Sequence, residues 1–477
     1  MRKKLFSGLI LLSVFTTSVS AQPNVHSQST KYEWPSEPEV REKLDKWQDQ
    51  KFGMIIHWGV YSVPGMIESW ALCSEDWIER DSTLSYGDFK KWYWGLSKSF
   101  NPVKFNPEQW ARAGKDAGMR YMVFTTKHHD GFNMFDTKET DYKITNGPFK
   151  KNPRADVAKY VFEAFRKQDF MIGAYFSKPD WHCEYFWWPK YATPNRNVNY
   201  DIRKYPDRWN KYKQFTYNQL SELMHNYGSV DVLWLDGGWV RPKETVNEEV
   251  LSWGAPIPEF SQEIDMPKIA SMAREAQPGI LIVDRTVHGP YENYQTPEQT
   301  IPKKQLNNPW ESCMTLGNAW GFVPNDQYKS AARVIQSLIE VTAKGGSLLL
   351  GIGPKADGTL PEEVVNRLEE IGRWMKVNGE AIYNTRITEK YHEGNTWFTQ
   401  SKNGNTKYAL ICIPEGQSTP PVVEWTGNSP EKGAEIKFLQ TGKPVKWKKE
   451  GEKVKIWLPK SVRNTYTPAL AFSINTP

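Results

Sequence analysis

The chain has 477 residues, with 61 Lys and Arg against 55 Asp and Glu, and a formal net charge of +6. This length is more than one domain usually holds, so we expect one large domain followed by a smaller one. The small positive excess is spread along the chain without a basic block, which excludes a typical nucleic-acid-binding protein.

The first 21 residues have the pattern of a secretory signal peptide. A basic start at residues 1–4 precedes a short apolar run at residues 5–15, and small residues end the segment at Ala21. We therefore expect export to the periplasm or the extracellular space, with a mature chain that begins at Gln22. No later stretch has the roughly 20 consecutive apolar residues that a membrane span needs.

Residues 22–380 alternate short apolar runs with helical patterns, which is typical of parallel strands joined by crossover helices. The apolar runs that predict strands are FGMIIHWG, YMVFTTKHH, FMIGAYFS, VDVLWLDGG, GILIVDR and GSLLLGIGP. Helical patterns lie near residues 107–117, 154–168, 208–226, 267–276, 327–342 and 361–378. The pattern favours an α/β fold, a (β/α)8-like TIM barrel, although only six of the eight strands of a complete barrel are evident.

Residues 381–477 differ in character from the rest of the chain. Strand-like runs such as TWFTQ, YALICI, AEIKFL, KVKIWLP and ALAFSI are separated by turn residues, which predicts a small C-terminal β-sandwich. Within the barrel region, the Trp- and Tyr-rich residues 180–207 are expected to form an extended loop that contributes to a binding surface. The four cysteines lie far apart, so neither a zinc cage nor a disulfide scaffold is indicated.

Polar residues follow several of the predicted strands. In parallel α/β barrels the active site lies at the carboxyl ends of the strands, where the connecting loops converge. The side chains found at these positions are His57, His128, His129, Tyr175, Asp236, Asp284 and Arg285. We therefore expect them to gather at one end of the barrel.

Asp236 is the sharpest of these signals. It ends an apolar run and is flanked by Trp234 and Trp239, where a carboxylate is costly to bury without a purpose. A turn or helix-cap aspartate is the alternative, because Gly237 follows. Hydrolysis of a glycosidic bond requires two carboxyl groups flanking the bond, one of them protonated at the start. The residues alone leave Glu292, Glu298 and Glu311 as candidates for the second group.

The histidines permit a different interpretation. His57, His128 and His129, with Asp236, are residue types that bind metal ions in barrel hydrolases. However, His128 and His129 are adjacent, and adjacent residues of an extended chain point to opposite sides, so both reach one ion only if the strand has already ended. We expect hydrogen bonding to sugar hydroxyls instead, with no metal and no cofactor; a buried structural role is the alternative for any one histidine.

Several longer motifs resemble glycoside hydrolase family 29, the α-L-fucosidases, over nearly all of residues 22–477. They are KFGMIIHWGVYSVPG, ESWALCSEDW, FTTKHHDGFNMFDTKETDY, LWLDGG, LLLGIGPKADG and IGRWMKVNGEAIYNT. The resemblance implies a retaining mechanism on an irregular (β/α) barrel with a C-terminal β-sandwich. It also implies a fucosylated oligosaccharide or glycoconjugate as the substrate.

The resemblance further implies roles for individual residues. The family's nucleophile, in its W-x-D strand end, falls on Asp236, and its acid/base on Glu298, with Glu311 as the runner-up. Trp320, in NAWGF, is implied to wall the pocket beside the methyl group of fucose. The remaining implied substrate-binding residues are His57, Glu68, Trp70, His128, His129, Tyr175, Trp234 and Arg285, with Ser69 intervening between Glu68 and Trp70.

The sequence therefore predicts an exo-acting retaining α-L-fucosidase that works through a covalent fucosyl-enzyme intermediate. One alternative is an enzyme of the same family that acts on a related sugar such as α-L-galactose. Another is a fucose-binding protein that has lost catalysis. The sequence does not predict the oligomeric state.

Overall fold

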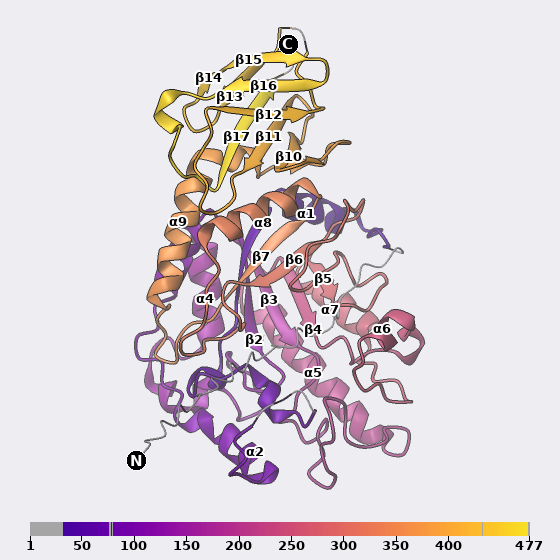
Figure 1. The fold of residues 1–477 in the computed structure, drawn as a ribbon. Helices are drawn as coiled ribbons and strands as arrows, with labels where there is room; N and C mark the ends of the chain where they lie inside the picture. The colour runs from indigo at the N-terminus through magenta and orange to yellow at the C-terminus, as the bar shows by residue number, and fades with distance from the viewer. Residues whose placement is uncertain (1–31, 76–77, 79, 432, 476–477) are drawn as a thin grey trace, which may run out of the picture.

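The computed structural model describes residues 32–75, 78, 80–431 and 433–475. The predicted signal peptide, residues 1–21, lies outside the described residues. Figure 1 shows a large part built of helices around a parallel sheet, with a smaller part made of strands packed at one end. In the described part of the chain, no helix is both long and apolar enough to span a membrane.

The large part is organised around a curled parallel sheet of seven strands. Their order in the sheet is β5-β4-β3-β2-β1-β7-β6. The strands are β1 (Phe52–Ile56), β2 (Tyr121–Lys127), β3 (Met171–Ser177), β4 (Val232–Asp236), β5 (Leu281–Asp284), β6 (Glu311–Thr315) and β7 (Ser347–Ile352). Six of them are the strands that the apolar runs predict. Their nearly continuous burial is typical of a parallel sheet that is covered on both faces.

The strand that the sequence did not reveal is β6. Its sequence, ESCMT, begins with Glu311 and has no apolar run, although the strand is almost fully buried. Isolated bridges join Val283 to Glu292, Gln295 to Trp310 and Glu298 to Cys313. Residues 292–298 therefore lie between the edge strands β5 and β6, where a regular barrel would place another strand, and this makes the barrel irregular.

Helices surround the sheet, and the six predicted helical segments are all present. They correspond to α3 (Pro107–Asp116), α4 (Val157–Arg166), α5 (Pro206–Asn226), α7 (Met266–Ala276), α8 (Ala331–Ala343) and α9 (Glu362–Asn378). Three further helices were not predicted: α1 (Pro38–Gln48), α2 (Tyr86–Gly95) and α6 (Glu248–Ser252). The first two have weaker apolar periodicity than α3 or α4, and α6 has only five residues.

Helix α1 closes the amino-terminal end of the barrel. Its apolar residues Val40, Leu44 and Trp47 form one core cluster with the side chains that point into the barrel. Trp47 is fully buried and stacks on Tyr294, with ring centroids 4.0 Å apart and planes 8° from parallel. Helix α1 therefore covers the barrel interior at the amino ends of the strands.

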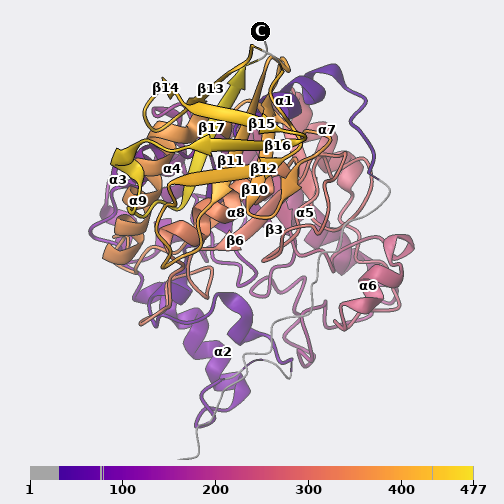
Figure 2. The same ribbon diagram turned by 45° about the horizontal axis from the view of Figure 1, so that its top comes forward.

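The small part consists of antiparallel strands in two sheets, one ordered β14-β13-β17-β11-β10-β8, with β9 beside β10, and the other β12-β16-β15. Figure 2 views these strands in front of the barrel. They are β8 (Thr385–Arg386), β9 (His392–Glu393), β10 (Thr396–Ser401), β11 (Thr406–Cys412), β12 (Val422–Thr426), β13 (Glu435–Phe438), β14 (Lys443–Pro444), β15 (Lys446–Glu450), β16 (Lys453–Trp457) and β17 (Ala469–Asn475).

A separate hydrophobic core fills the space between the two antiparallel sheets. It includes Phe398, Trp425, Ile456 and Phe472. The larger sheet packs on α8 and α9 of the barrel, where Trp374 Nε1 donates to the carbonyl of Ala469 at 2.9 Å. The small part therefore rests on the helical shell and not on the carboxyl ends of the barrel strands.

Candidate active site

Asp236 ends β4, and its carboxylate accepts side-chain hydrogen bonds from two neighbouring residues. The Tyr175 hydroxyl donates to Oδ2 at 2.7 Å, and Arg285 Nη1 donates to Oδ1 at 2.8 Å. Tyr175 lies on the neighbouring strand β3, and Arg285 directly follows β5. Gly237 adopts φ +88°, a conformation that favours glycine, and turns the chain away after the carboxylate.

The environment of Asp236 favours its ionised form. Burial alone would raise the pKa of this carboxyl, but the guanidinium of Arg285 and the hydrogen bond from Tyr175 outweigh burial and hold the pKa well below its usual value. The side chain is nevertheless 17% exposed, so it can be reached from the barrel mouth. An accessible carboxylate that stays ionised meets the requirement for a nucleophile.

Arg285 also contacts a second carboxyl group. Its Nη2 donates to Oε2 of Glu298 at 2.9 Å, so one guanidinium joins Glu298 to Asp236. The guanidinium lies over the Trp234 ring, 4.3 Å from its centroid. Because the guanidinium is planar and rigid, it fixes the relative positions of the two carboxyl groups that it binds.

Glu298 is placed by the irregular segment between β5 and β6. It pairs with Cys313 in an isolated parallel bridge, and the Gln299 amide donates to the Cys313 carbonyl at 2.9 Å. Trp320 Nε1 donates to the other oxygen of Glu298 at 3.1 Å. The Glu298 side chain remains 22% exposed, so both carboxyl groups that contact Arg285 face an accessible space.

Trp320 and His57 line the same space from the side of β1 and β7. Their rings lie 5.0 Å apart, and His57 also contacts the rings of His128 and Tyr175. Glu68 is buried, and its Oε1 accepts from the amide of Gly321 at 2.6 Å. Burial raises the pKa of Glu68 to about 7. The hydrogen bond between Gly321 and Glu68 therefore anchors the loop that carries Trp320.

His128, His129 and Trp70 lie together on the other side of Asp236. The rings of His128 and His129 have centroids 4.2 Å apart, and Trp70 approaches His129 edge-on at 5.1 Å. The His129 Nε2 lies 3.8 Å from Asp236 Oδ2. Strand β2 ends at Lys127, so the strand has ended before the pair, which explains why two adjacent rings can face one site.

Possible ligand atoms of His128, His129 and Asp236 lie within 4.8 Å of one another, so this group could bind a metal ion. Zinc ligands lie about 2.0–2.2 Å from the ion, so atoms up to 4.8 Å apart would have to move closer to bind it well. Both carboxylate oxygens of Asp236 already accept hydrogen bonds, one of them from the cationic Arg285. The arrangement fits a neutral polyhydroxy ligand better than a cation.

The other two candidate glutamates lie away from this space. Glu311 is completely buried inside the barrel, where it accepts from the Tyr121 hydroxyl at 2.7 Å and from Trp234 Nε1 at 3.1 Å. Burial raises its pKa to about 7. Glu292 accepts from His288 at 2.7 Å. Trp234 itself lies inside the barrel, stacked on Tyr175, beneath Arg285.

Several residues around the site were not predicted from the sequence. Ser69 and Ser177 contact the Nδ1 atoms of His128 and His129. Around Trp70 lie the rings of Trp181 and Trp239, and the guanidinium of Arg196, 4.8 Å from the Trp70 ring. Ser69 was known from the sequence only as the residue between Glu68 and Trp70, without a role, and the packing around Trp70 comes from loops far apart in the chain.

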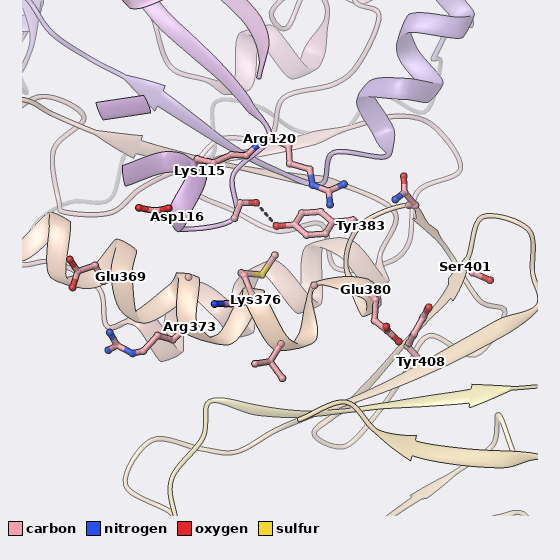
Figure 3. A pocket seen from close by; sticks show the side chains of 16 residues that line it. Lys115, Asp116, Arg120, Glu369, Arg373, Lys376, Glu380, Tyr383, Ser401 and Tyr408 are labelled. Atoms are coloured by element: carbon pink, nitrogen blue, oxygen red, sulfur yellow. Dashed lines mark hydrogen bonds between the residues drawn. The ribbon is translucent and has the colours of Figure 1, made fainter. Parts of the chain in front are cut away.

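A separate groove of about 1020 Å³ lies between the barrel and the antiparallel strands (Figure 3). Tyr383 lies at the centre of this groove. The Arg120 guanidinium lies 3.3 Å from the centroid of the Tyr383 ring, and the Tyr383 hydroxyl donates to the Gly118 carbonyl. Arg120 immediately precedes β2, so the groove lies at the amino ends of the strands. It is remote from the paired carboxylates and is not the candidate site.

Comparisons with known proteins show which proteins the whole chain is similar to. A family model described as "Alpha-L-fucosidase" matches residues 19–380. The chain is 28% identical to a plasma α-L-fucosidase of Pongo abelii over 429 residues, which cover 85% of this chain and 84% of the relative. Its fold is similar to that of α-L-fucosidase isoenzyme 1 of Paenibacillus thiaminolyticus, with a TM-score of 0.73, 28% identity, and coverage of 92% and 100% of the two chains. It is also similar to a Thermotoga maritima α-fucosidase solved with a mechanism-based inhibitor, with a TM-score of 0.70, 25% identity, and coverage of 93% and 100%.

Proposed function

Because the chain belongs to the α-L-fucosidase family, glycoside hydrolase family 29, we propose that it is an exo-acting retaining enzyme that hydrolyses terminal α-L-fucosyl linkages of glycans. The observation that carries this proposal is the pair of accessible carboxyl groups, Asp236 and Glu298, joined by the guanidinium of Arg285. Retaining glycosidases require two carboxyl groups that flank the bond to be broken.

In the first step, a carboxylate oxygen of Asp236 bonds to the anomeric carbon. The bond from that carbon to the leaving oxygen breaks, and Glu298 gives its proton to this oxygen. The product is a covalent β-fucosyl ester on Asp236. Because this ester carries no charge, Arg285 is then left paired with the newly ionised Glu298, the form that the second step needs.

In the second step, Glu298 removes a proton from a water molecule. The water oxygen bonds to the anomeric carbon, and the bond to Asp236 breaks, which restores both carboxyl groups. The sugar leaves with its original α configuration. The steps need no metal and no cofactor, because the chain supplies the nucleophile and the acid/base.

The surroundings of the two carboxyl groups suit one sugar ring. His57, His128 and His129 supply ring nitrogens for hydroxyl groups, while Trp70 and Trp320 supply flat apolar faces. Hydrogen bonds of this kind discriminate strongly against sugars that lack the matching hydroxyl. Helix α1 covers the opposite end of the barrel, and the two carboxyl groups are only partly exposed, which supports removal of terminal residues.

We further propose that the chain is exported, with residues 1–21 as the signal peptide, residues 22–380 as the catalytic domain and residues 381–477 as a β-sandwich domain. The residue pattern of the first 21 positions supports export, as does the similarity to a plasma enzyme. The family match ends at residue 380, and the antiparallel strands begin at Thr385. Amino-terminal sequencing of the exported protein would test the first boundary.

The experiment that tests this function is incubation with an aryl α-L-fucoside while proton NMR follows the first sugar released. We expect release of α-L-fucose ahead of its conversion to the other anomer. Initial release of β-L-fucose would overturn the retaining mechanism. Faster release from the matching aryl α-L-galactoside would indicate the related sugar, and fucose binding without any release would indicate a binding protein.

A further inference from the structure

Two buried serines contact the adjacent histidines of the candidate active site. The Ser69 Oγ lies 2.5 Å from Nδ1 of His128, and the Ser177 Oγ contacts Nδ1 of His129. Both serines are completely buried. They come from different elements, since Ser69 begins the short helix η2 (Ser69–Leu72) and Ser177 ends β3. In both rings Nδ1 is thus occupied, and Nε2 is the nitrogen left for a ligand.

The surroundings of Ser69 determine the proton position on His128. The backbone amide of Asp130 donates to the Ser69 Oγ at 3.0 Å, which occupies one lone pair of this oxygen. The Ser69 Oγ is also hydrogen-bonded to the carboxyl group of Asp130, and burial raises the pKa of that carboxyl to about 7. With Asp130 protonated and donating to Oγ, this oxygen accepts twice, and the Ser69 proton is left for Nδ1 of His128. His128 then accepts at Nδ1 and carries its proton on Nε2, so it presents a donor to the site.

The surroundings of Ser177 lead to the opposite result for His129. The Ser177 hydroxyl is 3.1 Å from the carbonyl of Pro179, which can only accept. A serine has one hydroxyl proton, so donation to Pro179 leaves the Ser177 oxygen to accept from Nδ1 of His129. His129 then carries its proton on Nδ1 and presents the lone pair of Nε2 to the site. If His129 instead carried its proton on Nε2, the single Ser177 proton could serve only one of the two contacts, the one with Nδ1 of His129 or the one with the Pro179 carbonyl.

The tautomers matter only if both rings are neutral. Burial lowers the pKa of His128 to about 4, and burial together with the neighbouring His128 lowers the pKa of His129 well below its usual value. Both rings therefore hold a single proton at neutral pH, and the position of that proton decides whether Nε2 donates or accepts.

We propose that Ser69 and Ser177 are positioning residues that hold His128 and His129 in opposite tautomers, so that the pair offers one donor and one acceptor to a sugar hydroxyl. This inference rests on the proposed function, because it assigns a specificity device to the same site. A hydroxyl held between the two rings accepts from His128 Nε2 and donates to His129 Nε2. A metal ion is disfavoured for the same reason, since only one of the two Nε2 atoms keeps its lone pair.

This arrangement predicts how the enzyme responds to altered sugars. Fluorine accepts hydrogen bonds weakly and cannot donate, so a deoxyfluoro sugar keeps the contact with His128 and loses the contact with His129. At the sugar position whose hydroxyl contacts His128 and His129, the wild-type enzyme should therefore prefer the natural hydroxyl to a fluorine substituent. Removal of the Ser177 hydroxyl should reduce that preference, because His129 is then no longer held as an acceptor.

The direct test is NMR of the ligand-free protein with ¹⁵N-labelled histidine, in which long-range proton–nitrogen correlations distinguish the two tautomers. His128→Gln and His129→Gln variants assign the signals. We expect His128 protonated on Nε2 and His129 on Nδ1. Ser69→Ala should alter only the His128 pattern, and Ser177→Ala only that of His129. Ser312→Ala, which removes another buried serine hydroxyl bonded to a carbonyl, should alter neither.

Activity provides the second measurement. Ser69→Ala and Ser177→Ala should each lower kcat/KM for an aryl α-L-fucoside by about tenfold, the scale of one lost neutral hydrogen bond, and Ser69→Thr should retain more activity than Ser69→Ala. Identical tautomers in the wild-type protein, or serine variants that leave both patterns unchanged, would overturn the inference while leaving the proposed function intact. Absence of fucose release by the wild-type enzyme would instead count against the function itself.

Discussion

Nη1 of Arg285 donates a 2.8 Å hydrogen bond to Oδ1 of Asp236, although 49 positions separate the two residues in the chain. They meet because Asp236 ends β4 and Arg285 follows the adjacent strand β5. The guanidinium of Arg285 outweighs the burial that would otherwise raise the pKa of Asp236. Its Nη2 atom donates to Glu298. The predictions below depend on this arrangement.

Replacement of the proposed nucleophile should abolish turnover and allow chemical rescue. Asp236→Gly should lower kcat for an aryl α-L-fucoside by several orders of magnitude, because the carboxylate that forms the covalent intermediate is removed. Azide should enter the space left by the carboxylate and partly restore release of the aryl group. NMR of the product should show β-fucosyl azide, whereas an α-azide or a lack of rescue would argue against Asp236 as the nucleophile.

Replacement of the proposed acid/base should have an effect that depends on the leaving group. Glu298→Ala should lower kcat/KM by about 10²- to 10⁴-fold for a poor leaving group, which needs proton donation, and much less for an activated aryl fucoside. Rates with a series of phenols of different acidity measure this dependence. Glu311→Ala is the comparison, since Glu311 lies inside the barrel. If Glu311→Ala shows the dependence and Glu298→Ala does not, the assignment is wrong.

Removal of the shared cation should move the acidic limb of the pH profile. In the wild-type enzyme Arg285 holds the pKa of Asp236 well below its usual value, so the nucleophile stays ionised far into the acidic range. Arg285→Met should raise the pKa of Asp236, shift the acidic limb of kcat/KM to higher pH, and lower the maximum by roughly 10²-fold. Arg367→Met, in a partly exposed ion pair on α9, should leave the profile in place. An unshifted acidic limb in Arg285→Met would contradict the electrostatic role.

Glu311 should make the folded state less stable as the pH rises. Its pKa is raised to about 7 by burial, so between about pH 4.5 and 7 the folded chain keeps a proton that the unfolded chain releases. Stability therefore falls with rising pH across this window, by about 1.4 kcal/mol for each unit of pKa difference.

Glu311→Gln removes this titration. Its free energy of unfolding, relative to the wild type, should rise between pH 5 and pH 8 when measured by urea denaturation. The exposed Glu244→Gln is the control and should show no such trend. A flat difference for Glu311→Gln would mean that Glu311 is ionised in the folded protein.

The strands of the barrel could be predicted from the sequence wherever a buried strand consists of consecutive apolar residues. The six strands with such runs and the six helices between them are all present. Strand β6 could not be predicted, because Glu311 and its polar neighbours are stabilised by partners on distant strands, such as Tyr121 and Trp234. Helix α6 was too short to give a recognisable period.

The candidate site was also predicted in part. Residues at strand ends, such as His57, Tyr175, Asp236 and Arg285, could be identified because parallel strands bring their carboxyl ends together. The choice among Glu292, Glu298 and Glu311 could not be made from the residues alone. It depends on the path of residues 292–298 between β5 and β6, which is held by bridges to strands elsewhere in the chain.

The sequence by itself determined the fold class, the family and the Asp236 strand end, because these depend on local periodicity and on contiguous motifs. Only the tertiary structure decided which glutamate shares Arg285 with Asp236, and which serines contact the two histidines. The physical reason is that a hydrogen bond depends on distances of about 3 Å and on direction, and both are set by the packing of elements far apart in the chain.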